Sequence, residues 1–220
     1  MNKNEKFVIT INRELGSGGR TVGRKLAEKL GVDFYDKAVI KGLQEKFHLT
    51  AEEIEKLKGR KQGWWADFKR QISGGADMVN YYIPKIGNEP ELLDTDEVFQ
   101  AETEILNGIA AEESCIVAGR SGFYVFRNHP NHLSIFIQAS MPFRIQRVAS
   151  KQNMTEDEAR KTIEKVDEMR ENYVKKYAKT SRYDTATMTS SSPLTARLKI
   201  RLWSRYFCLS DKDDILFYSK

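Results

Sequence analysis

Residues 6–31, KFVITINRELGSGGRTVGRKLAEKLG, carry the pattern that decides the fold. A short apolar run rich in β-branched residues predicts a strand, and a glycine cluster at positions 16, 18 and 19 follows it. A basic segment comes next, with apolar residues at helical spacing and a glycine at 31 to end the helix. A strand, a glycine turn and a helix in this order are the parts of a phosphate-binding loop, in which backbone N–H groups and the helix dipole attract an anion.

Strands and helices alternate along the rest of the chain. The apolar run SCIVAG, which ends at Gly119, predicts a central parallel strand covered on both faces, and residues 132–138 predict another strand. Helices are expected over residues 37–47 and 95–113, around Phe143, from the capping box at Thr155 to about Tyr177, and from Leu194 to Leu209, with a last strand at 215–218. This alternation predicts a three-layer α/β domain with a parallel sheet.

Residues 59–93 differ in character from what surrounds them. Glycines and prolines punctuate a tract in which five aromatic residues fall between positions 64 and 82. We interpret it as a mostly helical excursion, whose aromatics pack it onto the body, stack a base or form a dimer surface.

The composition is that of a globular protein with a phosphate-rich partner. The chain has 220 residues, a net charge of +5 and 40% hydrophobic residues. Its basic residues are interleaved with 31 acids, so a nucleic-acid surface is not required. No apolar run approaches a membrane span and no signal peptide is evident, so we expect a cytoplasmic protein with buried, reduced Cys115 and Cys208.

Three blocks of the sequence resemble the cytidylate kinase-like family of P-loop proteins. They are ITINRELGSGGRTVGRKLAEKLGVDFYDK, then IVAGRSG, and then IFIQASMPFRIQRVASKQ. The resemblance implies a single P-loop kinase-like domain over residues 1–220, with a helical acceptor-binding insertion at 37–93 and a lid-like segment at 150–182. It also implies phosphoryl transfer from ATP, with Mg²⁺, to a nucleoside monophosphate or another small acceptor.

The loop departs from the pattern G-x-x-x-x-G-K-[ST] because it lacks the lysine. One alignment puts Arg13 on the first glycine and Gly19 on the lysine. Shifting by one residue puts Arg20 on the lysine, and we prefer this alignment because the chemistry needs a cation there. In either case the donor phosphates are expected on the loop residues, with Thr21 as the metal ligand; these residues are Gly16, Ser17, Gly18, Gly19, Arg20 and Thr21.

The acceptor side also departs from the family pattern. Cytidylate kinases carry an aspartate after the arginine of the glycine–arginine turn, whereas here Ser121 follows Arg120. The resemblance makes Arg120, Ser121 and Asp36 substrate-binding candidates. Arg120 could equally pair with a carboxylate, and Asp36 could cap a helix. The lid arginines chosen as catalytic candidates, beside Arg20 and Arg13, are Arg144, Arg147 and Arg170.

Three functions remain open from the sequence. The first is an ATP-dependent kinase of the nucleoside monophosphate type. The second is a catalytically degenerate module that binds a nucleotide or phosphate and acts through partners, which the missing lysine and aspartate favour. The third and weakest is a basic nucleic-acid-binding protein.

Overall fold

The computed structural model describes residues 1–37, 40, 44, 50 and 95–184, together with the backbone of four later strands. Lys37, Ile40 and Gln44 are helical, as the sequence predicts. The rest of the helix at 37–47, the excursion at 59–93 and the aromatic tract at 64–82 lie outside the described residues. The interpretations of that tract, as packing, base stacking or a dimer surface, therefore stay predictions.

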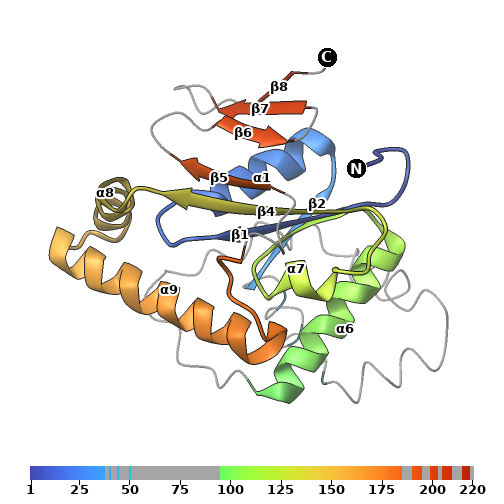
Figure 1. The fold of residues 1–220 in the computed structure, drawn as a ribbon, viewed down its shortest axis with the longest axis horizontal. Helices are drawn as coiled ribbons and strands as arrows, with labels where there is room; N and C mark the ends of the chain where they lie inside the picture. Colours follow the sequence, from blue (N-terminus) through green and yellow to red (C-terminus); the bar gives the residue numbers. More distant parts are fainter. Residues whose placement is uncertain are drawn as a thin grey trace, which may run out of the picture.

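The core of the fold is a parallel sheet in the order β2-β3-β1-β4-β5 (Figure 1). Its strands are β1 (Val8–Arg13), β2 (Asp33–Asp36), β3 (Cys115–Ala118), β4 (His132–Ala139) and β5 (Ser190–Leu194). All four strand pairs are parallel, and Val8 of β1 lies opposite Cys115 on one side and His132 on the other. The predicted central strand is confirmed, because β3 lies between two neighbours and all four of its residues are buried.

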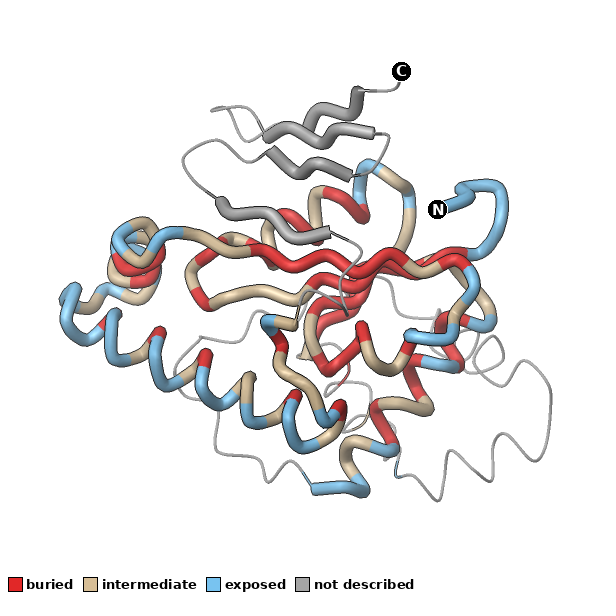
Figure 2. Tube along the Cα trace, in the orientation of Figure 1, coloured by how far each residue is buried: buried red, intermediate tan, exposed pale blue. Residues whose placement is uncertain are grey.

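Helices cover both faces of this sheet, which gives the three layers that the sequence predicts. The helix α1 (Gly19–Leu30) packs its buried residues against Ile9 and Ile11 on one face. On the other face, α6 (Asp96–Glu112) buries Ile105 and Ile109 against Val8, and α7 (Gly122–Val125) lies beside it. Figure 2 shows the buried backbone concentrated along the strands between these layers.

Two further helices follow β4 and reach back to the glycine loop. The helices are α8 (Met141–Gln152) and α9 (Glu156–Ala178), and α9 begins with the predicted capping box, formed by Thr155 and Glu158. Ala159 and Ile163 of α9 pack with Leu15 of the loop in one buried cluster. The buried stripe continues along the helix at the 3.6-residue period to Val174 and Ala178, and Met169, which lies off this stripe, is 47% exposed.

The C-terminal part corrects one prediction. Instead of a helix over 194–209, the chain forms β6 (Lys199–Leu202) and β7 (Arg205–Leu209), which pair with each other and with β8 (Ile215–Tyr218) in an antiparallel sheet. The sequence KIRL alternates polar and apolar residues, and RYFCL is rich in residues that favour strands. In this segment the period-two alternation determines the structure, although leucine and arginine also have high helix propensities. The last strand, at 215–218, is confirmed.

His132 on β4 gives a prediction for stability in acid. Burial, and then the nearby His129, lower the pKa of His132 to about 4, although a backbone hydrogen bond at Phe126 opposes this shift. The imidazole ring also contacts the Thr10 hydroxyl, with Nε2 and Oγ1 2.8 Å apart. As the pH falls from 6.5 to 4, His132 becomes protonated in the unfolded chain but stays neutral in the folded chain. The free energy of unfolding therefore falls by at most about 3 kcal/mol.

Urea unfolding at pH 7, 5 and 4 measures this loss. His132→Gln keeps a polar side chain that does not titrate, so the variant should lose less stability than the wild type over the same range. Equal losses in the two proteins would contradict the assignment to His132.

Candidate phosphate-binding site

The glycine loop joins β1 to α1 at the carboxyl edge of the sheet, as the sequence predicts. Gly16 and Gly18 have φ angles of 82° and 87°, a left-handed conformation in which glycine costs least. Gly18 is the N-cap of α1, so the first N–H groups of that helix point out of its end without helical partners. The hydroxyl of Ser17 donates to the carbonyl of Glu14 at 2.9 Å and fixes the turn from within.

The amides that follow this turn are available to an anion. Within the part of the chain that the structure describes, no hydrogen bond is made by the backbone N–H groups of Gly16, Gly18, Gly19, Arg20 and Thr21. Leu15, one residue earlier, donates its N–H to Asp167 instead. The available amides therefore begin at Gly16 and include every residue chosen from the sequence except Ser17, whose N–H donates to the carbonyl of Glu14 at 3.3 Å.

Arg13 places a cation between this loop and the neighbouring turn after β3. Its side chain lies against Gly119, where an added Cβ would collide with Nη1 of the guanidinium. The guanidinium makes no hydrogen bond or ion pair with a described residue. Burial, and then the charge of Arg170, lower the pKa of Arg13 to about 9, with Arg182 and Arg20 adding to the effect and only Asp36 opposing it. The site thus holds more positive charge than its own carboxylates balance.

Arg20, the preferred substitute for the lysine, forms an ion pair with Asp36, the acidic residue chosen as a substrate-binding candidate. Its Nε lies 2.6 Å from Oδ2 of Asp36, which is 3% exposed at the end of β2. The structure therefore brings together one residue chosen for the donor side and one chosen for the acceptor side. This pair orients Arg20 across the start of α1 toward β2.

Arg147 reaches the loop from α8. Its Nη2 donates to the Thr21 hydroxyl at 3.3 Å, and its guanidinium lies within 3.7 Å of the point where a Gly18 Cβ would stand. Arg147 is thus the lid candidate whose guanidinium faces the amides of the loop. It also lies at the hydroxyl that the sequence assigns to a metal ion.

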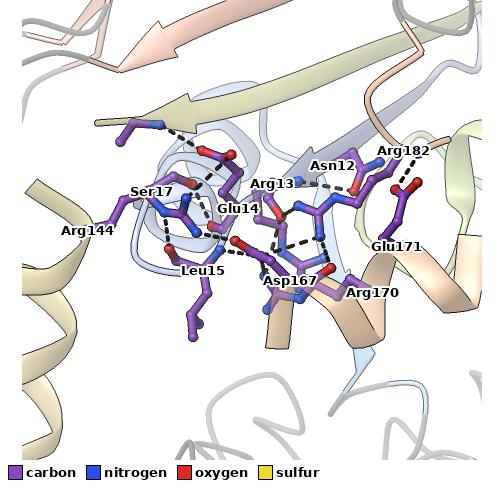
Figure 3. Close-up of polar contacts among 11 residues, drawn as sticks. Asn12, Arg13, Glu14, Leu15, Ser17, Arg144, Asp167, Arg170, Glu171 and Arg182 are labelled. Carbon is purple, nitrogen blue, oxygen red and sulfur yellow. Dashed lines mark hydrogen bonds and ion pairs between the residues drawn. The ribbon is translucent and has the colours of Figure 1, made fainter. Parts of the chain in front are cut away.

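Arg144 and Arg170, the other lid candidates, are held by protein groups (Figure 3). Arg144 donates from Nε to the carbonyl of Leu15 at 2.7 Å and pairs with Asp167. Arg170 donates from Nη1 to the carbonyl of Arg13 at 3.3 Å. Both side chains bind the backbone of the loop in this structure.

Two residues missed by the sequence analysis complete this network. Asp167 of α9 accepts from Leu15, and Arg182, which is completely buried, donates to both Asp167 and the carbonyl of Arg13. The contacts with Leu15 and Arg13 join positions more than 150 residues apart, so no local motif could have indicated them.

Arg120 and Ser121 form a turn at the end of β3 with an unusual backbone. Gly119, Arg120 and Ser121 have consecutive φ angles of 84°, 53° and 49°. Arg120 donates from Nε to Glu102 at 2.7 Å, so the pairing with a carboxylate, weighed above against phosphate binding, is present. The buried hydroxyl of Ser121 has no partner among the described residues and belongs to a pocket that Asn12 and Gly119 also line.

Comparison with known proteins identifies the family. A sequence model described as the cytidylate kinase-like family matches residues 8–189. The chain belongs to this family. A search of curated protein sequences gave no significant match.

Several solved structures are similar to this chain at low sequence identity, and the first one named here shares its fold. An uncharacterized protein from Eubacterium ventriosum is similar with a TM-score of 0.61 and 19% identity, covering 86% of this chain and 88% of that one. A shikimate kinase from Acinetobacter baumannii has a TM-score of 0.41 and 14% identity, with 88% of each chain covered. A gluconokinase from Sinorhizobium meliloti has a TM-score of 0.37 and 15% identity, over 73% and 75% of the two chains.

The resemblance stated from the three sequence blocks is thus confirmed, and so is the P-loop type of α/β fold. Membership of the cytidylate kinase-like family makes the chain a kinase-like protein. No helix in the described ranges is long and apolar enough to cross a membrane.

Gly16 offers a test of how closely the kinase-like loop packs on α8. A Cβ at Gly16 would lie 2.8 Å from the carbonyl oxygen of Arg144, whereas a Cβ at Gly31 would meet nothing within 4 Å. Both glycines are left-handed, so alanine costs about 1–2 kcal/mol at either place for the backbone alone.

We therefore expect Gly16→Ala to lower stability more than Gly31→Ala and to weaken nucleotide binding at least tenfold. Gly31→Ala is the matched control and should leave binding unchanged. Chemical unfolding and calorimetric titration with ATP measure the two effects. Equal behaviour of the variants would show that the contact between the loop and α8 has no effect.

Proposed function

We propose that this chain is a nucleotide-dependent phosphotransferase that moves a phosphoryl group from ATP to a nucleoside monophosphate or another small acceptor. The observation that carries the proposal is Arg13, a cation that lies between the glycine loop and the turn after β3 and has no hydrogen-bond or ion-pair partner among the described residues. Open α/β sheets bind their ligands at this carboxyl edge. A bound phosphate would supply the negative charge that the surrounding residues lack.

The loop residues fit the phosphates of a nucleotide. The backbone N–H groups of Gly16 and of Gly18 to Thr21 have no partner within the described part of the chain, and the left-handed glycines leave the backbone open to a close approach. Arg147 would add a charge-assisted contact above Gly18, and Arg20 would add a second cation at the start of α1.

Magnesium would bind through a single protein ligand, the Thr21 hydroxyl, in place of the contact that Nη2 of Arg147 makes with it at 3.3 Å. No group of three histidine, cysteine or acidic residues that could hold a metal exists among the described residues. Mg²⁺ is commonly held by one or two protein groups together with the oxygens of substrate phosphates, so the oxygen of Thr21 could serve as the protein's ligand. When bound, the ion would neutralise charge on the transferred phosphoryl group.

The acceptor would lie beside Arg120 and Ser121. A cavity of about 10 Å³ lies at Ser121 between the ends of β1 and β3; it holds no more than about one water molecule, so the acceptor would bind at its mouth. The unpartnered hydroxyl of Ser121 can accept or donate a hydrogen bond there. We propose that residues 37–93 complete this acceptor site and that residues 150–182 act as the lid. ATP as the donor would suit a cytoplasmic enzyme.

Formation of a nucleoside diphosphate tests the proposal directly. The full chain is incubated with ATP, Mg²⁺ and each nucleoside monophosphate in turn, and the products are separated by ion-exchange chromatography. Product with at least one monophosphate supports the nucleotide-kinase form. The absence of product with all of them would overturn it.

A degenerate binding module is the second candidate, and the pair between Arg20 and Asp36 favours it. A cation held by a carboxylate at 2.6 Å is less available to a transferring phosphoryl group than a lysine would be. This candidate predicts that ATP raises the melting temperature without phosphoryl transfer. Failure of ATP and GTP to bind at millimolar concentration would exclude it.

A further inference from the structure

We propose that Asp167 is a positioning residue that ties α9 to the glycine loop and sets the conformation in which the loop binds phosphate. The effect on nucleotide binding rests on the function proposed above. The tie itself is a property of the free protein and rests on its contacts alone. Asp167 lies on α9, 23 residues beyond Arg144 in the sequence and 152 beyond Leu15.

The carboxylate of Asp167 receives four contacts (Figure 3). Its Oδ1 accepts the backbone N–H of Leu15 at 3.0 Å and lies 3.4 Å from Nη1 of Arg182 and 3.6 Å from Nη1 of Arg170. Its Oδ2 accepts a hydrogen bond from Nη2 of Arg144. One carboxylate, only 9% exposed, thus joins a loop amide to three arginines.

Leu15 is fixed by this arrangement on every side. Its N–H is bound by Asp167, its carbonyl is bound by Nε of Arg144 at 2.7 Å, and its side chain is buried in the cluster formed by α8 and α9. Two residues earlier, the carbonyl of Arg13 accepts hydrogen bonds from Arg170 and Arg182. The backbone that leads into Gly16 is therefore positioned by side chains that meet at Asp167.

Asp167 is also the carboxylate that contacts all three of these arginines, whereas Glu14 contacts Arg144 alone, with Oε1 3.5 Å from Nη1. Without it, three guanidinium groups would lie close to one another and to Arg13, and the N–H of Leu15 would be buried without an acceptor. Asp167 is thus the common acceptor of the network, and its removal should release the loop.

This geometry couples the lid segment to the donor site. Because α9 lies within residues 150–182, any displacement of the helix withdraws the acceptor of Leu15 and changes the loop. Conversely, a ligand that favours the observed loop favours the observed position of α9, because coupling of this kind is reciprocal. Arg144 and Arg170 then act through the loop backbone.

Hydrogen exchange of single amides tests the tie without any nucleotide. In Asp167→Ala the Leu15 amide should exchange at least tenfold faster than in the wild type. In Asp167→Asn, whose side-chain oxygen can still accept that amide, the increase should be smaller. Glu168→Ala is the matched control, because Glu168 is the exposed neighbour on the same helix and its removal should change nothing.

Nucleotide binding provides the second measurement. We expect the Kd for ATP to rise at least tenfold in Asp167→Ala, with partial recovery in Asp167→Asn. If the chain turns over, KM for ATP should rise more than kcat falls, since the loop holds the donor in the ground state. Circular dichroism and the melting temperature of each variant establish that it is folded.

Several results would overturn the proposal. One is a Leu15 amide that exchanges at the wild-type rate in folded Asp167→Ala. Another is tighter ATP binding in Asp167→Asn, because this would show that the carboxylate competes with phosphate for the arginines. If Asp167→Ala does not fold, Asp167→Asn decides both points. Faster Leu15 exchange in a protein that does not bind ATP would leave the tie intact and contradict only the proposed function.

Discussion

Replacing Arg13 with methionine should make the protein more stable and weaken its binding of nucleotides. The wild-type guanidinium is crowded by Arg170, Arg182 and Arg20 and has no partner among the described residues, so folding carries an electrostatic cost at this position. Methionine has a similar length and no charge. We expect a gain of about 1 kcal/mol, or about 2–4 °C in melting temperature for a domain of this size.

The loss in binding follows from the same charge. A phosphate beside the Arg13 guanidinium would make a charge-assisted hydrogen bond at a partly desolvated position. Removing the guanidinium should therefore raise the Kd for ATP between about tenfold and a hundredfold. Opposite signs for stability and affinity distinguish a ligand-binding cation from a structural one, whose removal would lower stability.

The dependence on pH gives an independent check. The pKa of Arg13 is about 9 in the free protein, and a bound phosphate would raise it, so ATP affinity should fall as the pH rises above about 9. In Arg13→Met this part of the decline should be absent. Calorimetric titrations between pH 7 and pH 10 measure both curves.

Arg127→Met is the matched control for Arg13→Met. Arg127 is exposed, and its guanidinium donates to the nearby carbonyl of Tyr124. This change removes the same charge from the surface and should alter neither affinity nor the pH profile. If the two variants bind ATP equally well, Arg13 is not a phosphate ligand.

Replacing Glu102 with leucine should cause a large loss of stability. The side chains of Glu102 and Arg120 are 4% and 6% exposed, and the hydroxyl of Tyr173 donates to the same carboxylate at 3.2 Å. Removing the carboxylate takes from a buried arginine the opposite charge that it contacts here, and breaking a buried ion pair in this way typically costs about 3–5 kcal/mol. We expect the melting temperature to fall by about 10 °C, as measured by calorimetry.

The double variant Glu102→Leu with Arg120→Met separates the charge from the packing. Two apolar side chains of similar size often replace a buried ion pair without loss, so most of the stability should return. The proposed acceptor site would still lack its arginine, and any phosphoryl transfer should stay low. A double variant as unstable as the single one would show that packing, and not the loss of the ion pair, lowers the stability.

The sequence predicted the parts of the fold that local patterns determine. The run before Gly119 has no polar residue and becomes a central strand, and Thr155 with Glu158 forms the predicted capping box. The glycine spacing at 16 and 18 located the left-handed loop at the start of α1. In each case the residues that carry the pattern also make the local contacts.

Contacts between distant segments could not be predicted in this way. Asp167 resembles any other acid on an amphipathic helix until the fold brings it to Leu15. The partner of Arg20 depends on the adjacency of α1 and β2, and Arg182 follows a helix with no motif to mark it. The expected helix at 194–209 failed for another reason, because a short segment there satisfied two periodicities and the alternating one prevailed.

The turn after β3 has a consequence for the entropy of binding. Arg120 and Ser121 have φ angles of 53° and 49°, which residues with side chains seldom adopt, and the pair with Glu102 holds the first of them there. The turn is thus already ordered in the folded protein, so the free-energy cost of its unusual backbone is part of folding and not of binding. If the proposed acceptor docks here, it would meet a turn that is already ordered. Binding would then cost the protein little conformational entropy, so a small molecule with few contacts could still bind.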